Sequence, residues 1–451
     1  DRVGIRNLTI INAGKAAEGL IWKQNNRSFL QNVKVDSGIS RQLYLTDNKN
    51  FVVNRTDIVQ RGSINQQNPY LFDGCSGFVF SDNTSLTVDG SPTFESVHDA
   101  LITGNHFTRD ALHQDESVVI SSHGLVMDFA YRIAIIGNTF DVAHGPITNH
   151  QRNDGETLLS EGGGGKRTES LGVAVSGTPT TLYDPHNAID VNPFGSGIPE
   201  DYGVAIVSGT GAGQTREVLG YAHGTLRVNR AWDVIPDATS HYATFLWGLD
   251  KAVIKGNRLL GNPRGIWLYR AAFRDVDIEK NTIIDGGGIL AETFQSESEK
   301  QFDLAYDVRI ADNVIRNVSG RWMSYVDAIF VNKDASPFGT ADIGIEIRGN
   351  SILANTPNAS FNSEGYANQE GFASLMRSES SAPQRSPGSE TLLGTIFQRN
   401  SCQHCQRAFV VGTGDRGFVL SIGKPMVASS GFSDWQTLGQ ESAGSVDTLA
   451  Q

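Results

Sequence analysis

The sequence predicts an all-β solenoid in which short strands stack as coils, interrupted once by a small β module. Three observations predict this fold class. A short motif centred on asparagine recurs along the chain, glycine accounts for 49 of the 451 residues, and only 19% of the residues are charged. Abundant glycine and few charges favour short strands with tight turns over long helices rich in Ala, Glu, Lys and Leu. A hydrophobic fraction of 39% is sufficient for a packed core and excludes global disorder.

The recurring motif consists of an apolar residue, any residue, a small or polar residue, asparagine, any residue and a second apolar residue. Looser versions precede the clear copies at residues 5–11, 30–35 and 52–58. Each copy predicts two short strands bent at the asparagine, which tolerates a left-handed backbone. Asparagine side chains at equivalent corners can also bond to one another as a ladder. The predicted ladder positions are Asn105, Asn138, Asn257, Asn281, Asn313, Asn350 and, in a degenerate copy, Asn400.

Consecutive ladder asparagines are separated by 33, 119, 24, 32, 37 and 50 residues. A coil of about 24 residues cannot bury its own apolar face, so the coils must stack. This organisation resembles the right-handed parallel β-helix of the pectate-lyase-like superfamily, over residues 1–165 and 248–425. We expect residues 426–451 to form a C-terminal tail.

The 119-residue interval predicts an inserted small β-barrel or sandwich at residues 166–247. Within this interval, just before the predicted insert, Gly162–Gly165 form a flexible exit from the coils. Alternating strands broken by glycine and Pro-Asp turns follow. The sequence segments 208–214 and 232–240 resemble those of a module that recurs in β-helix proteins of bacteria and phages. Gly209–Gly213 lacks the Lys-Ser/Thr of a nucleotide-binding loop and is interpreted as a turn.

Charge and cysteine content exclude several classes. The 37 Lys and Arg against 49 Asp and Glu give a net charge of -12, which disfavours nucleic acid and anionic membrane as partners. The sequence contains no run of 18 apolar residues, so no membrane-spanning helix is predicted. Three cysteines cannot build a disulfide framework. Cys402 and Cys405 have a metal or redox spacing, but no second such pair completes a zinc site, so we expect small residues filling a strand-turn position. No metal and no cofactor is predicted.

Polar residues concentrate between residues 110 and 161, and six of the ten histidines lie between 98 and 150. Coils stack about 4.8 Å apart, so residues of neighbouring coils become neighbours in space. We therefore expect His113 with Asp115, His123 with Asp128, and the segment 150–161 to line one face. The inserted module leaves the coils beside this segment, which predicts that it roofs a cleft.

Four carboxylates are candidates for acid/base chemistry: Asp128, Asp154, Glu156 and Glu161. Glycoside hydrolysis needs two carboxyl groups, about 5–5.5 Å apart for retention or 6.5–9.5 Å for inversion. On a strand, Asp154 and Glu156 share a face, and Glu161 points oppositely unless the strand bends. The adjoining leucines 158 and 159 would desolvate one carboxyl group and keep it protonated. The alternative is that Asp154 lies in a turn and Glu156 is a solvated cap.

His150 and Arg152 favour a second chemistry, because a polysaccharide lyase must neutralise a uronate carboxylate and abstract the C5 proton. The alternative for His150 is a structural corner residue. A set of aromatic and basic side chains is predicted to bind substrate. For the aromatic members the alternatives are stacking on a sugar ring and ordinary packing in the protein. This set is His123, Trp267, Tyr269, Arg270 and Trp322.

Proteins that resemble this fold are mostly glycan-active. The residue sets of polygalacturonases and pectate lyases are absent, and Asp184-Pro-His186 matches a mannuronan epimerase motif only inside the inserted module. We therefore predict a carbohydrate-active enzyme, first a glycoside hydrolase using two carboxylates. A lyase on a uronic-acid glycan and a non-catalytic glycan-binding or tailspike-like protein are the alternatives. The resemblance implies a poly- or oligosaccharide partner and an extracellular or periplasmic location, and homo-oligomer formation is left open. Because the sequence has no initiator Met and its first residues already have a strand pattern, we expect a processed or truncated N-terminus.

Overall fold

The computed structural model describes residues 3–12, 18–37, 41–61, 68–88, 90–109, 123–141, 156–161, 170–186, 202–262, 264–296, 298, 301–319, 324–332, 342–354, 371–378, 392–393, 396–405, 409–412, 419–422, 436–438 and 446–449. All regular elements in these ranges are β-strands. The same ranges contain no helix whose length and apolar character would let it cross a membrane.

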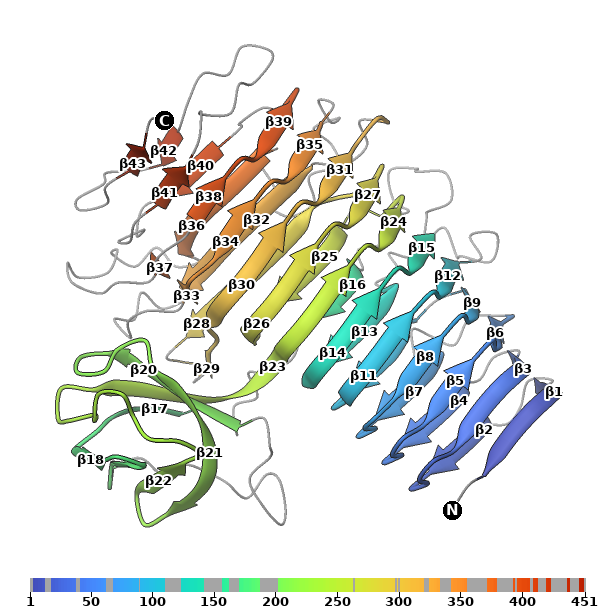
Figure 1. The fold of residues 1–451 in the computed structure, drawn as a ribbon, viewed down its shortest axis with the longest axis horizontal. Helices are drawn as coiled ribbons and strands as arrows, with labels where there is room; N and C mark the ends of the chain where they lie inside the picture. The colour runs from blue at the N-terminus through green and yellow to red at the C-terminus, as the bar shows by residue number, and fades with distance from the viewer. Residues whose placement is uncertain are drawn as a thin grey trace.

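Two parallel sheets form the walls of the solenoid (Figure 1). In sheet B each coil contributes one strand. These strands are β2 (Glu18–Lys23), β4 (Arg41–Thr46), β7 (Tyr70–Asp73), β10 (Thr93–Glu95), β13 (Leu125–Asp128), β16 (Glu156–Ser160), β25 (Arg264–Tyr269), β28 (Ile289–Ser296), β32 (Tyr325–Asn332), β36 (Gly371–Ser378), β40 (Phe409–Gly412) and β42 (Gln436–Leu438), with β29 (Gln301–Phe302) antiparallel to β28.

In sheet A most coils contribute strands on both sides of a bend. They are β1 (Gly4–Asn12), β3 (Phe29–Ser37), β5 (Val52–Asn54), β6 (Asp57–Gln60), β8 (Val79–Ser81), β9 (Thr84–Thr87), β11 (His98–Thr103), β12 (His106–Arg109), β14 (Ala130–Ile136), β15 (Thr139–Asp141), β23 (His241–Lys255), β24 (Arg258–Leu260), β26 (Ala272–Glu279), β27 (Thr282–Ile284), β30 (Ala305–Ala311), β31 (Val314–Arg316), β33 (Asp342–Ile343), β34 (Glu346–Arg348), β35 (Ser351–Leu353), β37 (Leu392–Leu393), β38 (Ile396–Gln398), β39 (Ser401–Gln403), β41 (Val419–Ile422) and β43 (Val446–Leu449).

The predicted fold class, a right-handed parallel β-helix, is confirmed. The first apolar residue of each motif copy pairs in register with its equivalent on the next coil and is fully buried. This row of isoleucines comprises Ile102, Ile135, Ile254, Ile278, Ile310 and Ile347. The row belongs to one continuous core between the sheets, so each coil buries its apolar face against its neighbours.

The predicted asparagine ladder is also confirmed. Each side-chain amide donates from Nδ2 to Oδ1 of the next asparagine at 2.9–3.1 Å, from Asn105 through to Asn400. The ladder contains one earlier member, Asn83, which donates to Asn105 at 2.9 Å. The motif missed it because its sixth position holds Ser85, which is buried but polar.

The left-handed residue at each bend was predicted wrongly. It is the residue before the asparagine that has positive φ, with values of 53–66° at Gly104, Gly137, Gly256, Lys280, Asp312, Gly349 and Arg399. This explains why glycine recurs at the third motif position, since glycine adopts a left-handed backbone without steric cost. The asparagine itself is thereby free to point its amide into the ladder.

Residues 170–186 and 202–247 contribute antiparallel strands with a buried cluster of their own. The strands are β17 (Ser170–Val173), β18 (Ser176–Thr178), β19 (Thr181–Tyr183), β20 (Tyr202–Ser208), β21 (Thr215–Ala222) and β22 (Thr225–Val228). The N-terminal half of β23 pairs antiparallel with β17 and β20, while its C-terminal half pairs parallel with β14 and β26. The predicted boundary between residues 247 and 248 thus falls inside one continuous strand; the domain bounds stay predictions.

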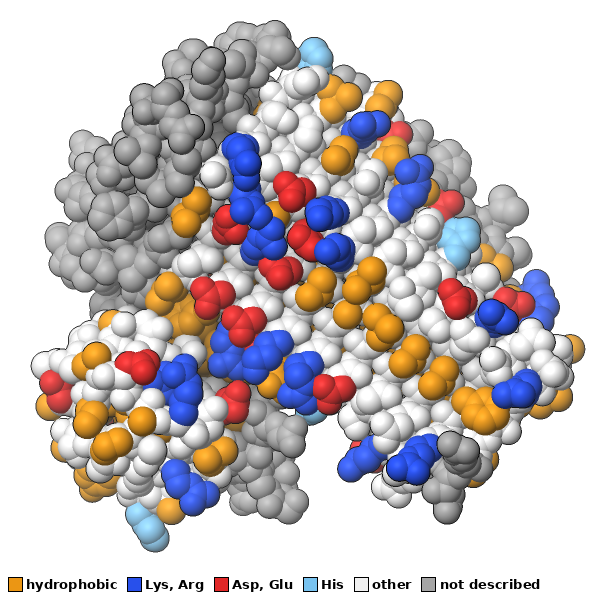
Figure 2. All heavy atoms as spheres, in the orientation of Figure 1, with side chains coloured by type: hydrophobic (Ala, Val, Ile, Leu, Met, Phe, Trp, Pro, Cys, Tyr) orange, Lys and Arg blue, Asp and Glu red, His pale blue; other side chains and the backbone are white. Residues whose placement is uncertain are grey.

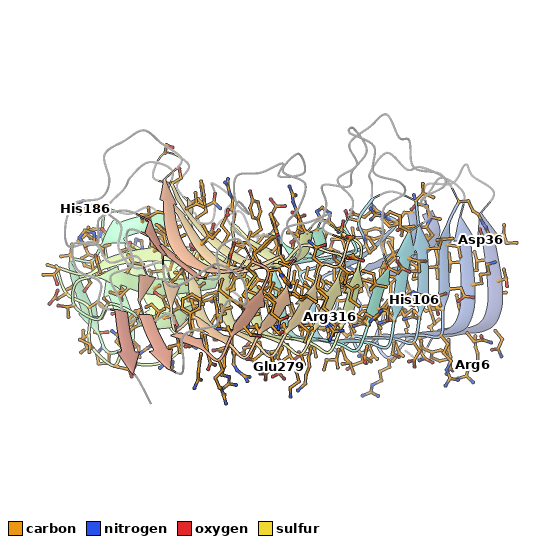
Figure 3. The ribbon with its side chains drawn as sticks, turned by 90° about the horizontal axis from the view of Figure 1, so that it is seen from above. Arg6, Asp36, His106, His186, Glu279 and Arg316 are labelled. Atoms are coloured by element: carbon orange, nitrogen blue, oxygen red, sulfur yellow. A yellow bond between two sulfur atoms is a disulfide. The ribbon has the colours of Figure 1, made fainter. Side chains whose placement is uncertain are left out.

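The outer face of sheet A carries a chain of ion pairs that runs from coil to coil. Lys255 contacts Glu279 at 2.6 Å, Arg309 contacts Glu279 at 3.5 Å and Glu346 at 3.3 Å, and Arg348 contacts Glu346 at 3.5 Å. Figure 2 shows acidic and basic side chains interspersed over the middle of the visible face. In Figure 3 Glu279 projects from the same side as Arg6. The charges of this face neutralise one another.

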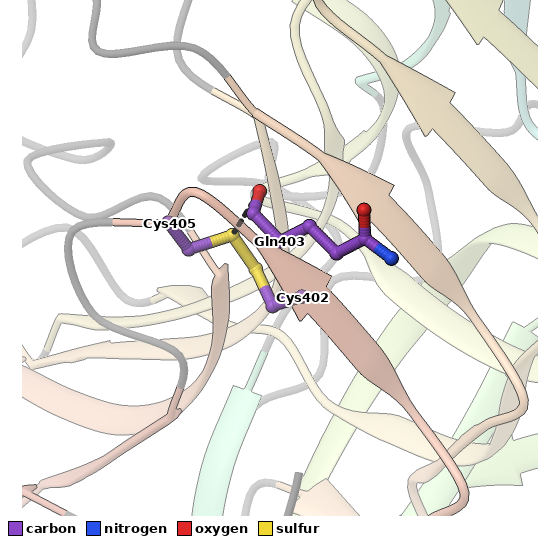
Figure 4. Close-up of a disulfide and its surroundings, with 3 residues drawn as sticks. All are labelled: Cys402, Gln403 and Cys405. Atoms are coloured by element: carbon purple, nitrogen blue, oxygen red, sulfur yellow. Dashed lines mark hydrogen bonds between the residues drawn. A yellow bond between two sulfur atoms is a disulfide. The ribbon is translucent and has the colours of Figure 1, made fainter. Parts of the chain in front are cut away.

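Cys402 and Cys405 form a disulfide, which corrects the expectation of small residues that merely fill a strand-turn position (Figure 4). Cys402 lies in β39, and His404 has a left-handed φ of 60°. This bend brings the two Cα atoms to 5.9 Å, within the usual range for a disulfide. Both cysteines are buried in the core, so the bond ties Cys405 to β39.

Candidate functional site

Seven of the predicted site residues lie in the described part of the chain, and all seven lie on or beside three adjacent strands of sheet B. They are His123, Asp128, Glu156, Glu161, Trp267, Tyr269 and Arg270, on β13, β16 and β25. The structure therefore brings together side chains that are up to 147 positions apart in the sequence. Asp154, His150, Arg152 and Trp322, with His113 and Asp115, lie outside the described residues.

Four carboxylates form a row at the C-terminal ends of successive sheet B strands. Asp73, Glu95 and Asp128 are paired in register on β7, β10 and β13. Glu161 follows β16, and its backbone N–H donates to Oδ1 of Asp128 at 3.0 Å. We call Asp73, Glu95, Asp128 and Glu161 the acidic column. Asp73 and Glu95 were not predicted, although each shares with Asp128 a local signal: an aromatic residue or methionine, an acid, and then a left-handed residue.

Burial changes the protonation of the acidic column. It raises the pKa of Asp128 to about 7, and the negative charges of Glu161 and Glu95 act in the same direction. The hydrogen bond from the Glu161 N–H opposes this rise only in part. Burial and the charge of Glu156 also raise the pKa of Glu161, against the positive charges of His123, Arg270 and Arg264. At neutral pH a large share of Asp128 side chains therefore carries a proton.

A second polar cluster lies at the opposite ends of the same strands. Oγ of Ser91 lies 2.6 Å from Nδ1 of His123, and Nε2 of His123 lies 2.8 Å from Oε2 of Glu156. Oε1 of Glu156 accepts from Nη1 of Arg264 at 2.7 Å. We call Ser91, His123, Glu156 and Arg264 the relay chain. Ser91 and Arg264 were not predicted, because the loops that decide which residues align on neighbouring coils have unequal lengths.

Glu156 is held ionised. Its burial favours the neutral form, but the hydrogen bond and charge of His123 and the charge of Arg264 outweigh it, so the pKa is lowered. With one oxygen bonded to each partner and 5% exposure, this carboxylate has no proton to give. The expectation that the adjoining leucines keep one carboxyl group protonated therefore does not apply to Glu156. Leu158 packs in the core and Leu159 lies in an outer cluster.

The predicted aromatic platform is largely buried. Trp267 is 3% exposed, and its Nε1 donates to Oη of Tyr325 at 2.8 Å, so the packing alternative describes it better than sugar stacking. Tyr269 is half-buried beside it. Arg270 lies 5.2 Å from the Tyr269 ring centroid and pairs with Glu292 at 3.1 Å. Among the described members of this set, His123, Tyr269 and Arg270 therefore keep accessible surface.

Among the residues that the structure describes, no group of three or more His, Cys, Asp or Glu side chains is arranged to hold a metal ion. The acidic column places its carboxylates one coil apart rather than around a common centre.

No family model and no curated protein matches the chain. Among solved structures it is similar to an exopolygalacturonase from Thermotoga maritima (8% identity, TM-score 0.35, covering 93% of this chain and 79% of that one). It is also similar to a mannuronic acid specific polysaccharide family 6 lyase from human gut microbiota (8%, 0.33, 98% and 86%). A third is the tailspike gp49 of Pseudomonas phage LKA1 (12%, 0.26, 70% and 52%). The likeness concerns the fold alone.

Proposed function

We propose that this protein is a carbohydrate-active enzyme, specifically a glycoside hydrolase in which Asp128 and Glu161 form the carboxyl pair. The observation that carries the proposal is the raised pKa of Asp128, about 7, directly beside Glu161. Glycoside hydrolysis needs one carboxylic acid to protonate the leaving oxygen and a second carboxylate to attack or to activate water. A carboxyl group that keeps its proton near neutral pH suits the first role.

In this proposal Asp128 donates its proton to the glycosidic oxygen, and Glu161 acts on the anomeric carbon. The two residues occupy neighbouring coils, which are about 4.8 Å apart. That spacing is close to the separation of about 5–5.5 Å in retaining enzymes, so it supports a covalent intermediate on Glu161 and retention of configuration. Tyr269, at the next coil position, offers an aromatic face to the sugar.

Glu156 has a positioning role here, because its two oxygens are bonded to His123 and Arg264 and its charge helps to raise the pKa of Glu161. Asp154, Arg152, His150 and Trp322 stay predictions, as does an extracellular or periplasmic location.

The test is a panel of neutral and acidic polysaccharides, with reducing ends and unsaturated-product absorbance followed together. New reducing ends without absorbance support the hydrolase. Asp128→Asn and Glu161→Gln should then each lower kcat about 10²–10⁴-fold, the usual contribution of a positioned acid or base. Asp73→Asn is the matched control, because it removes a carboxylate of the same column two coils away. Loss of activity in the control to the same extent would contradict the assignment.

A lyase is the second candidate, and one observation favours it: the guanidinium groups of Arg264 and Arg270 act electrostatically on Glu161. Such groups can neutralise a uronate carboxylate. The four carboxylates of the acidic column oppose a polyanionic substrate. Absorbance that rises together with reducing ends would identify the lyase, and silence in both measurements on a panel that contains the substrate would favour a binding or adhesive protein.

A further inference from the structure

Ser91, His123 and Glu156 are linked by hydrogen bonds in a manner that the proposed hydrolase does not use. They come from three successive coils: Ser91 precedes β10, His123 precedes β13, and Glu156 begins β16. The Oγ–Nδ1 distance is 2.6 Å and the Nε2–Oε2 distance is 2.8 Å. Ser91 is 9% exposed and the His123 side chain 14% exposed. A hydroxyl, an imidazole and a carboxylate thus follow one another in line, from the buried hydroxyl of Ser91 through the partly exposed His123 to Glu156.

The hydrogen-bond network assigns the protons. Glu156 is ionised and can only accept, so Nε2 of His123 must donate to it. Only the neutral imidazole can act as a base, and in that form Nδ1 accepts and the Ser91 hydroxyl donates to it. The positive charge of His123 that lowers the pKa of Glu156 belongs to the protonated form that follows proton transfer. The order hydroxyl, base, carboxylate is that of an activated nucleophile. The two ring nitrogens exchange the places they have in the Ser-His-Asp triad, which is recognised by roles rather than by sequence position.

We propose that Ser91 is a nucleophile, activated by His123 and supported by Glu156, and that it hydrolyses esters of short acyl groups. Further contacts fix the arrangement. The backbone N–H of His123 donates to Oγ of Ser91 at 3.2 Å, and Arg264 holds the far oxygen of Glu156 at 2.7 Å. Arg109, only 7% exposed, donates from Nη2 to the carbonyl of His123 at 3.2 Å. Its positive charge beside the site favours the negative oxygen that develops on the acyl carbon.

The reaction balances without a further reactant except water. Oγ of Ser91 bonds to the acyl carbon while its proton passes to Nδ1 of His123. Collapse of the tetrahedral intermediate breaks the ester bond, and the departing alkoxide takes that proton. Water then attacks the acyl-serine, gives one proton to Nδ1, and releases the carboxylic acid as the proton returns to Oγ of Ser91. One ester and one water give one acid and one alcohol.

The limited exposure of Ser91 restricts the acyl group to a small one. On the substrate class proposed above, such an ester is an O-acetyl group on a sugar hydroxyl. Only the identification of the substrate as an O-acetylated sugar rests on the proposed function; the assignment of Ser91 as a nucleophile is independent of it.

The experiment uses the full chain, 4-nitrophenyl acetate as substrate and a fluorophosphonate as covalent probe. We expect release of 4-nitrophenol, and a phosphonyl adduct on the peptide that contains Ser91, found by mass spectrometry. Ser91→Ala should abolish both signals, and His123→Gln should lower the rate about 10²–10⁴-fold. Ser160→Ala is the matched control, since Ser160 is a fully buried serine of the same sheet outside the relay chain, and it should keep both signals.

Wild-type protein that hydrolyses no ester and carries no adduct on Ser91 would overturn the proposal, as would an adduct on another residue or unchanged hydrolysis by Ser91→Ala. Labelling of the wild type does not depend on whether a variant folds. Polysaccharide cleavage is measured through different products, so failure of the hydrolase proposal and failure of this one are distinguishable.

Discussion

Asp128 and Glu156 are carboxylates on adjacent strands, yet their pKa values move in opposite directions. Asp128 is surrounded by other carboxylates and receives one backbone hydrogen bond, so burial dominates and its pKa rises to about 7. Glu156 is more deeply buried but bonded to His123 and Arg264, which together lower its pKa. Partners rather than depth decide which carboxyl group keeps its proton.

The pH profile of glycan cleavage should show this difference. If Asp128 is the acid, kcat/KM falls as pH rises through about 7, because the proton is lost. Glu95→Gln removes a neighbouring negative charge and so should lower the pKa of Asp128. We expect the alkaline limb of the profile to move to lower pH in that variant. A limb that stays in place or moves upward would contradict the role given to Asp128.

Glu156→Gln should destabilise the fold as well as weaken the relay chain. It removes the negative charge that two buried partners share, and breaking a buried ion pair typically costs about 3–5 kcal/mol. Denaturant unfolding monitored by circular dichroism measures the change. The control is Glu279→Gln on the outer face of sheet A, where the Lys255 partner is 41% exposed and we expect about 0–1 kcal/mol. Equal losses in the two variants would refute the distinction.

At the scale of the element, the ladder and the sheet positions differ in how far the sequence predicts them. The bend is local, so six residues suffice to identify it, and seven of the eight asparagines from Asn83 to Asn400 were found. The site depends on register between coils whose loops vary in length. The polar segment from 110 to 161 pointed to His123, Asp128, Glu156 and Glu161, but Ser91, Arg264, Asp73 and Glu95 join them only through pairing.

Asn281→Ala tests how far the coils depend on one another. Asn281 accepts from the backbone N–H and Nδ2 of Asn257, and donates to Asn313 and to the carbonyl of Ile254. Its loss leaves several buried polar groups unpaired, each at about 1–3 kcal/mol. Asn400→Ala lies at the last of these rungs and should cost less. Thermal unfolding compares the stability of the two variants. A larger loss of stability in Asn400→Ala than in Asn281→Ala would contradict the idea that an interior asparagine couples the coils on both sides.

At the scale of the whole molecule, one apolar cluster joins the antiparallel strands of residues 170–247 to the coils of the β-solenoid. Phe245 and Trp247 of β23 pack with Phe302, Leu304 and Tyr306. Two fully buried carboxyl groups lie next to this cluster in the sequence. Asp303 accepts from Gln301 at 2.8 Å, and Asp342 accepts from Thr293 at 2.8 Å. Burial raises both pKa values, that of Asp342 to about 8.

These two groups should make the fold more stable in mild acid than in mild base. In the unfolded chain an aspartate loses its proton near pH 4, whereas folded Asp342 keeps it until about pH 8. Between these values the folded state binds more protons, so the free energy of unfolding falls as pH rises, by up to about 1.4 kcal/mol per pH unit for each group. Relative to wild type, Asp342→Asn should therefore gain stability progressively from pH 5 to pH 8.5, and Asp303→Asn should change in the same direction. A constant difference across that range, measured by urea unfolding, would contradict the assignment.

The asparagine ladder also gives the solenoid a direction. In every contact between ladder side chains from Asn83 to Asn350, the amide donates toward the C-terminal end and accepts from the N-terminal side, so the individual dipoles add as vectors along the axis. An array with a direction has two unlike ends, one offering acceptors and the other donors. A two-fold axis across the solenoid joins like ends and cannot extend the array, whereas translation along the axis can. Any assembly that continues this ladder from one copy to the next must therefore be head to tail.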